Sequence, residues 1–259
     1  MLSDLKCFRC CNWLHFDCVH HHGTGKLDEQ TNELVLGGKD RISVVYYRAG
    51  YTPNDYGPDG VEWKARELME WSTAIKCPSI GYHLIGSKHF QTIFAQKEVL
   101  LRYLSESEAD RLRAVFVGLH SLQHHETDKA VQSVMADAKR NHRGYVLKPQ
   151  REGGGNNYYN EQIPAMMDKL SAKELAGYIL MERIYPKEVE TVQVRNYESF
   201  RVKAICEIGI YSTFLHDGSH REPVIDRVSG TLLRTKQAEV TEGGVATGYA
   251  VLDSVVLAD

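Results

Sequence analysis

A run of three consecutive glycines at positions 153–155 constrains this chain more than any other feature. It lies in the stretch 148–157, where Lys148, Arg151 and Glu152 precede the glycines. Glycine permits positive φ and a close approach of the backbone to a ligand, and successive N–H groups in such a loop form an anion site. Two cationic side chains add donors for phosphate oxygens, and a carboxylate is a ligand that Mg²⁺ prefers. This chemistry predicts a phosphate-and-metal loop, although glycine content alone fits a flexible surface hairpin equally well.

Composition places the chain among ordinary globular proteins. Its 259 residues suffice for one large domain or two small ones, and 42% of them are hydrophobic and 25% charged. The formal net charge of −3 carries no polyanion-binding signature, and no apolar run reaches membrane-spanning length. We therefore predict neither nucleic acid nor a membrane as a partner. Four of the six cysteines lie in the first 18 residues, unlike a disulfide scaffold, and no signal peptide is evident. A reducing, cytosolic compartment is the prediction.

Residues 1–29 form a Cys/His-rich segment whose composition differs from the rest of the chain. The spacing of Cys7, Cys10, His15 and Cys18 resembles the middle of a PHD-type zinc finger. In that fold the two pairs serve different zinc sites, and each closed site needs four well-placed ligands. We therefore expect this segment to be disordered or foreign to the main domain. A zinc-dependent interaction module built on residues 7–22 is the alternative.

Hydrophobic periodicity predicts mainly helices in the first half of the chain. The β-branched and aromatic run 41–47 predicts a buried strand, 59–76 an amphipathic helix, and 87–140 two or three further helices. Ser107 with Asp110 gives a start that resembles a capping box. The apolar face of the 59–76 helix is expected to comprise Val61, Ala65, Leu68 and Met69.

From residue 144 onward the pattern changes to strands. Cys206, next to Glu207 in a long strand but on the opposite face, is expected to be a core thiol. Helices followed by strands that flank a glycine-rich lid indicate an α+β fold with an ATP clamp rather than a doubly wound sheet. The expected elements are strands at 145–147, 178–184 and 200–215, a helix at 162–170, and a hairpin turn at Asp217-Gly218.

Five blocks in this order resemble eukaryotic-type glutathione synthetase: Lys148–Asn157, Met181–Ile184, Glu207–Ile210, Leu232–Lys236 and Gly243–Ala246. The resemblance covers residues 30–259. It implies an ATP-grasp fold, with part of an α/β substrate-binding lobe at 30–87 and an ATP-grasp domain carrying the glycine-rich lid at 88–259. It also implies ATP-dependent ligation of glycine to γ-glutamylcysteine through an acyl phosphate, with ATP and Mg²⁺ as cofactors.

The resemblance further implies a role for each matching position. Lys148 and Arg234 are the catalytic candidates, and Glu152 is the Mg²⁺ ligand. Ala49 stands where the family carries Asp, which removes a carboxylate that could hold the amino group of the substrate. The implied ATP contacts are Lys88, Lys148, Arg151, Gly153, Gly154, Gly155, Asn156, Asn157, Tyr159, Met181, Glu182, Arg183, Ile184, Glu207, Lys236 and Glu242. The implied peptide contacts are Arg48, Gly50, Tyr51, Arg234, Val245 and Ala246.

The family's chain is nearly twice as long, and its other half supplies two further Mg²⁺ ligands and part of a homodimer surface. Glu152 alone would not fix Mg²⁺ on a triphosphate, and lost orientation costs orders of magnitude in rate. We therefore expect little ligase activity from these 259 residues by themselves, and the homodimer of the family is in doubt for them. Two alternatives stay open. One is an inactive nucleotide-binding pseudoenzyme or fragment; the other is a family ligase with an altered substrate, prompted by Ala49.

Overall fold

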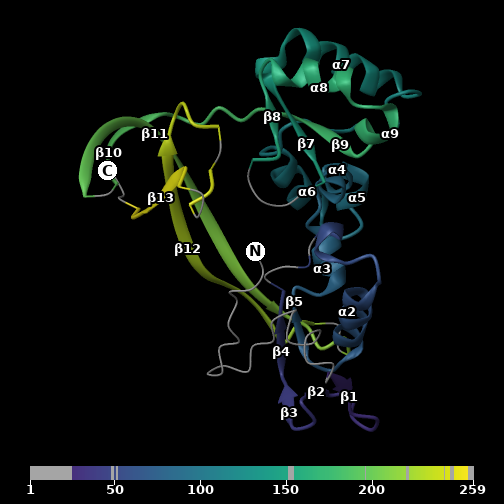
Figure 1. Ribbon diagram of the computed structural model, residues 1–259. Helices are drawn as coiled ribbons and strands as arrows, with labels where there is room; N and C mark the ends of the chain where they lie inside the picture. Colours follow the sequence, from purple (N-terminus) through teal and green to yellow (C-terminus); the bar gives the residue numbers. More distant parts are fainter. Residues whose placement is uncertain are drawn as a thin grey trace. The chain divides into compact units, whose positions relative to one another are not determined.

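A computed structural model describes residues 25–47, 50, 52–150, 155–195, 197–219, 222–241, 243–245 and 248–255 (Figure 1). Contacts divide the chain into two compact units. Unit 1 comprises residues 1–121 and 149–152, and unit 2 comprises residues 122–148 and 153–259. The zinc-finger-like segment 7–22 lies outside the described residues. The domain boundaries expected at 29/30 and 87/88 stay predictions.

Unit 1 combines short strands with helices around a small apolar core. Strands β1, β2 and β3 form one antiparallel sheet, and β4 pairs in parallel with β5. The core comprises Leu34, Ile42, Val45, Ala65, Met69 and Ala74. The elements are β1 (Lys26–Leu27), β2 (Leu34–Leu36), β3 (Asp40–Ile42), β4 (Val44–Tyr46), η1 (Pro53–Asp55), α2 (Val61–Trp71), β5 (Ile75–Cys77), α3 (Ile80–Ile85), α4 (Lys88–Phe94), α5 (Lys97–Leu100), α6 (Glu106–Arg113) and β6 (Leu119–Ser121).

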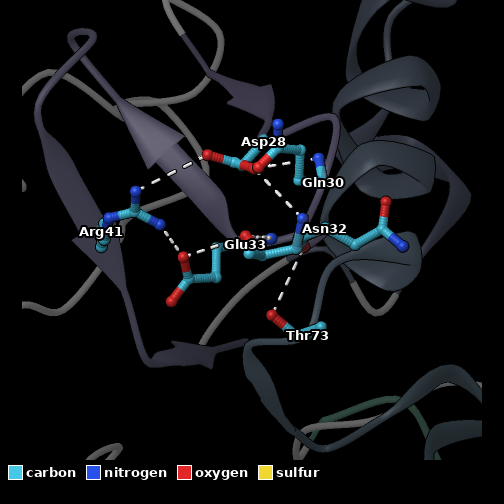
Figure 2. A network of polar contacts seen from close by, with 7 residues as sticks. Asp28, Gln30, Asn32, Glu33, Arg41 and Thr73 are labelled. Carbon is cyan, nitrogen blue, oxygen red and sulfur yellow. Dashed lines mark hydrogen bonds and ion pairs between the residues drawn. The ribbon is translucent and has the colours of Figure 1, made fainter.

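A polar network fixes the connection between β1 and β2 (Figure 2). The Asp28 carboxylate accepts hydrogen bonds from the backbone N–H groups of Gln30 and Thr31 at 3.0 and 3.1 Å, and these bonds lower the pKa of Asp28. Arg41 from β3 forms ion pairs with Glu33 and, at 3.6 Å, with Asp28. The Asn32 carbonyl accepts from the Thr73 N–H at 2.9 Å. The turn is thereby attached both to β3 and to the segment that precedes β5.

Several expectations for unit 1 are wrong in detail. The strand expected at 41–47 breaks at Ser43, because β3 pairs with β2 whereas β4 pairs with β5. The helix expected at 59–76 ends at Trp71, since residues 75–77 pair with β4 as a strand. The residues that α2 buries are Ala65, Arg66 and Met69, while Val61 is exposed.

The helices between 87 and 140 also differ from expectation. Four are present, namely α4, α5, α6 and, in unit 2, α7 (Lys129–Arg140), where two or three were expected. The capping box lies two residues earlier than predicted: the Ser105 hydroxyl accepts from the Glu108 N–H, and the Glu108 carboxylate accepts from the Ser105 N–H. The usual glutamate therefore stands in place, and Asp110 falls within the helix.

Unit 2 contains two sheets (Figure 1). One has neighbouring strands in the order β9-β7-β8, and the other has the order β10-β11-β12-β13, in which each neighbouring pair is antiparallel. A long hairpin of β11 and β12 dominates the second sheet. Besides α7, the elements are η2 (His142–Gly144), β7 (Tyr145–Pro149), β8 (Tyr158–Tyr159), α8 (Gln162–Lys169), α9 (Ala172–Leu175), β9 (Tyr178–Glu182), β10 (Val189–Arg195), β11 (Glu198–Leu215), β12 (Ile225–Gln237) and β13 (Ala250–Asp253).

The expected strands and helix of this region are confirmed within two residues at each end. The Asp217-Gly218 turn also lies where predicted, between two antiparallel strands, with Gly218 at φ 77°. Helices α7, α8 and α9 pack on the first sheet through the core residues Leu122, Ala138, Leu147, Ile163, Met167, Leu175 and Leu180. Among the described residues, no helix has both the length and the apolar character that a bilayer span requires.

Candidate nucleotide site

A cavity of about 460 Å³ lies within unit 2 and is lined by strands of both its sheets. This volume falls within the roughly 300–1,000 Å³ of small-molecule pockets. The lining residues are Val146, Lys148, Tyr159, Met181, Glu182, Arg183, Ile184, Pro186, Ile205, Cys206, Glu207, Arg234, Lys236, Ala238, Val240, Thr241, Gly243 and Ala250.

The β7–β8 hairpin contributes one wall. Val146 pairs with Tyr159 across this hairpin, and Lys148 follows Val146 by two residues, so strand alternation gives all three one face. All three line the cavity. The glycine-rich stretch joins these two strands, and Gly155 there has φ 85°, which strains any residue with a side chain. The loop is thus the connection of a hairpin in which the paired residues Val146 and Tyr159 border the cavity.

The end of β9 and the residues that follow it form a second wall of the cavity. Arg183, just after β9, connects this wall to the β7–β8 hairpin. Its Nη1 donates to Asn160 Oδ1 at 3.1 Å, and its backbone N–H donates to the Gly144 carbonyl at 2.8 Å. The guanidinium lies over the rings of Tyr159 and Tyr185, 5.9 and 5.1 Å from their centroids. Cation–π contacts at such distances are weakly favourable. Together they hold the chain that leaves β9 beside Tyr159.

The third wall comes from β11 and β12, where the side chains of opposite charge are paired. Glu207 lies directly opposite Arg234 across the two strands, and their side chains form an ion pair. Lys236 Nζ donates to the Thr241 carbonyl at 3.0 Å. Among these lining residues, four cationic side chains (Lys148, Arg183, Arg234, Lys236) face two carboxylates (Glu182, Glu207). The cavity is therefore locally cationic in a chain whose net charge is −3.

A buried threonine fixes the orientation of the two cationic residues that flank it. Thr235 is fully buried, and its hydroxyl donates to Asp253 Oδ2 of β13 at 2.8 Å. The Gln193 side chain of β10 reaches the Thr235 carbonyl at 3.5 Å. Because adjacent strand residues point to opposite faces, anchoring Thr235 on one face leaves Arg234 and Lys236 on the other.

The cavity brings together nine of the residues predicted from the sequence: Lys148, Tyr159, Met181, Glu182, Arg183, Ile184, Glu207, Arg234 and Lys236. Other predicted residues are described but do not line it. Lys88 begins α4 of unit 1, and Gly50 also belongs to unit 1. Gly155, Asn156, Asn157 and Val245 belong to unit 2. Eight predicted residues lie outside the described residues: Arg48, Tyr51, Arg151, Glu152, Gly153, Gly154, Glu242 and Ala246. Their roles stay predictions.

The apolar lining was missed, although strand periodicity could have found much of it. Val146, Ile205 and Ala238 each lie two residues from a predicted site residue in the chain. Ala250 pairs with Lys236 across β12 and β13. The expectation that Cys206 is a core residue is wrong, because the residue is exposed and free of a disulfide. It is among the residues that line the cavity, and its Sγ lies 3.6 Å from the Thr235 hydroxyl oxygen. This part of β11 is not covered, since Ile208 two residues on is 52% exposed.

Similarity to known proteins in sequence and in fold identifies the class of protein to which this chain belongs. Residues 17–257 match the family described as eukaryotic glutathione synthase, ATP binding domain. The fold also resembles that of a glutathione synthetase-like effector (GSS30) from Globodera pallida in its apo form, with a TM-score of 0.62 and 22% identity, over 90% of this chain and 46% of that one. Fold and family together define an ATP-binding domain, and the predicted ATP-grasp architecture is confirmed.

Curated relatives identify the family more closely. Glutathione synthetase of Dictyostelium discoideum is 44% identical over 90% of this chain and 48% of its own length. The chloroplastic enzyme of Solanum lycopersicum is 45% identical over 88% and 41%, and the Homo sapiens enzyme is 42% identical over 89% and 48%. This chain belongs to the eukaryotic glutathione synthase family. It spans about half the length of the curated relatives it matches.

Proposed function

We propose that this chain provides the ATP-binding part of a ligase that joins glycine to γ-glutamylcysteine. The observation that carries the proposal is the cavity of unit 2, where nine residues predicted from separate sequence blocks meet. Apolar residues such as Met181, Ile184 and Val240 suit a purine ring, and Lys148 and Lys236 suit phosphate oxygens. The residues present therefore fit a nucleotide in both shape and charge.

In the proposed reaction, a carboxylate oxygen of γ-glutamylcysteine attacks the γ-phosphorus of ATP, and ADP leaves. The glycine amine then attacks the acyl carbon, loses a proton and expels phosphate. Lys148 and Lys236 hold the negative phosphates, and Arg234 orients a carboxylate of the peptide. Preorganised cationic groups of this kind stabilise the charge that develops during transfer.

Mg²⁺, when bound, would neutralise charge on the phosphates. Within the described residues, no group of three His, Cys, Asp or Glu side chains is placed to hold a metal. The Mg²⁺ part of the proposal therefore rests on Glu152, which lies outside them. The cytosolic location predicted from the cysteines also remains a proposal.

Calorimetry of the purified chain with ATP tests the proposal directly. Lys236→Met should weaken ATP binding by about tenfold or more, because one charge-assisted contact to a phosphate is lost. Lys173→Met, at an exposed lysine of α9, is the matched control and should leave the affinity unchanged. Phosphate release with γ-glutamylcysteine, glycine and Mg-ATP tests turnover. ATP binding without turnover would favour the nucleotide-binding pseudoenzyme, and absence of ATP binding would refute the proposal.

A further inference from the structure

Tyr185 differs from its neighbours in the segment 181–186, all of which the structure describes. Every other residue of this segment lines the nucleotide cavity: Met181, Glu182, Arg183, Ile184 and Pro186. Tyr185 does not line it, and it lies outside the sequence blocks that carry the family resemblance. Its hydroxyl donates instead to a carbonyl of η2, the short helix that precedes β7. Tyr185 therefore needs an explanation other than direct contact with a ligand.

Two residues that follow β9 are bonded to two consecutive carbonyl groups before β7. The Tyr185 hydroxyl donates to the Arg143 carbonyl, and the Arg183 backbone N–H donates to the Gly144 carbonyl at 2.8 Å. The Arg183 guanidinium lies 5.1 Å from the centroid of the Tyr185 ring, a distance at which a cation–π contact is favourable. Tyr185 thus holds η2 through its hydroxyl and Arg183 through its ring, and it anchors the chain that leaves β9.

The chain between β9 and β10 has few other restraints. Among the described residues, 184–188 form no backbone–backbone hydrogen bond, and Pro186 has no N–H to donate. Ile184 and Tyr185 are 56% and 65% exposed, so little packing fixes them. A loose wall must be ordered when a ligand binds, and that ordering weakens binding. A side chain that anchors this segment before the ligand arrives should therefore strengthen binding.

The wall that Tyr185 anchors differs chemically from the side of the cavity that suits phosphates. The segment 181–186 contributes apolar side chains, which suit a purine base. These are Met181, Ile184 and Pro186. The lysines that suit phosphate oxygens, Lys148 of β7 and Lys236 of β12, come from other strands. A change confined to the segment should therefore affect the base and the phosphates differently.

We propose that Tyr185 is a positioning residue, which holds the segment 181–186 so that this wall receives the base of the nucleotide. The inference rests on the proposed function, because it takes the cavity as an ATP site. Tyr185 acts through Arg183 and the backbone around it, without touching the nucleotide. Its hydroxyl and its ring both contribute. Phenylalanine, which keeps the ring alone, should therefore preserve part of the effect, and leucine should preserve less.

Inorganic triphosphate separates the base from the phosphates in the first test. Tyr185→Leu should weaken ATP binding in calorimetry by about tenfold, because an unanchored wall must be ordered on binding. Affinity for inorganic triphosphate should stay unchanged, since that ligand lacks a base. Tyr185→Phe should show a smaller loss for ATP. Tyr197→Phe, at a fully exposed tyrosine between β10 and β11, is the control and should change neither affinity.

The two ligands also distinguish this inference from a merely structural effect. ATP affinity unchanged in Tyr185→Leu, or an equal loss of affinity for triphosphate, would overturn the positioning role. Because Tyr185 is largely exposed, both substitutions should fold. Absence of ATP binding in the unaltered chain would instead refute the proposed function, and the anchor would then be decided by the second test.

The second test needs no ligand. The Arg183 amide, which donates to the Gly144 carbonyl, exchanges its hydrogen with solvent when the segment opens locally. Mass spectrometry of fragments that contain residue 183 measures this exchange. Tyr185→Phe should speed it by about threefold to tenfold, because one hydrogen bond of the anchor is lost, whereas Tyr197→Phe should not. Exchange unchanged in both Tyr185→Phe and Tyr185→Leu would show that Tyr185 does not anchor the segment.

Discussion

Substitution of Glu207 by Gln separates the contribution of the Glu207–Arg234 ion pair to stability from its role in ligand binding. The Glu207 side chain is 61% exposed and that of Arg234 is 37% exposed. Exposed ion pairs contribute about 0.2–1 kcal/mol to stability, because water screens the charges. Glutamine keeps the size and an acceptor oxygen. The free energy of unfolding in urea should therefore fall by less than about 1 kcal/mol.

The effect on ATP should be larger if the carboxylate contacts the nucleotide as proposed. Hydrogen bonds to a charged group contribute about 1.5–3 kcal/mol, which corresponds to a roughly 10- to 150-fold change in dissociation constant. Arg234, released from its partner, should bind a peptide carboxylate no more weakly than before. Calorimetry with ATP and then with γ-glutamylcysteine measures both affinities.

Glu190 offers a matched control for this experiment. It lies directly opposite Lys203 across β10 and β11, as Glu207 lies opposite Arg234, but it does not line the nucleotide cavity. Glu190→Gln should change neither affinity. If Glu207→Gln binds ATP as tightly as the unaltered chain, the proposed contact is refuted. If the free energy of unfolding of Glu207→Gln falls by more than about 2 kcal/mol, then the conclusion that this exposed ion pair contributes little to stability is wrong.

Three further predictions concern the fold. Leu180→Ala removes a fully buried side chain from the core of unit 2, so urea unfolding should show a loss of about 2–5 kcal/mol. Thr235→Val removes the donor to Asp253, and the same measurement should show a loss of about 1–3 kcal/mol; an unchanged value would mean that this bond does not anchor β12 to β13. Glu108 and Glu174 accept the hydrogen bonds of two capping boxes, which lower their pKa. Their contribution should be complete above the ordinary glutamate pKa and lost as pH falls through the lowered one, and Ser105→Ala should reduce this acid sensitivity in pH-dependent unfolding.

Sequence patterns predicted long elements well and short ones poorly, for a physical reason. The strand at 200–215 is long enough for its composition to determine it, and β11 extends only two residues further at its start. The break at Ser43 and the strand at 75–77 depend on pairing between segments distant in sequence, which local propensity does not contain. The prediction of the capping box was wrong for a different reason. Ser105 with Glu108 satisfied the full rule, whereas Ser107 with Asp110 satisfied only a relaxed one.

The family resemblance supplied the candidate site residues, including the apolar Met181 and Ile184, but it left out apolar lining residues beyond the matching blocks. Lysines, arginines and carboxylates in strands stand out in a sequence, but Ile205 and Ala238 do not. Cys206 was assigned to a core because its neighbour Glu207 was assigned to the site. That inference assumes that one strand face is always covered. In the described part of β11, Ile208 and Ile210 are 52% and 59% exposed, so alternation there separates two open faces.

Strand register explains why the residues of unit 2 that line the cavity are different from those that form its core. In β7, Leu147 is fully buried among helix-packed core residues, while Val146 and Lys148 on either side of it line the cavity. In β8, Tyr158 packs on that core and Tyr159 borders the cavity. A shift of the hairpin by one residue would exchange the two sets, which apolar burial strongly opposes. The core on one face therefore determines which side chains the cavity receives on the other.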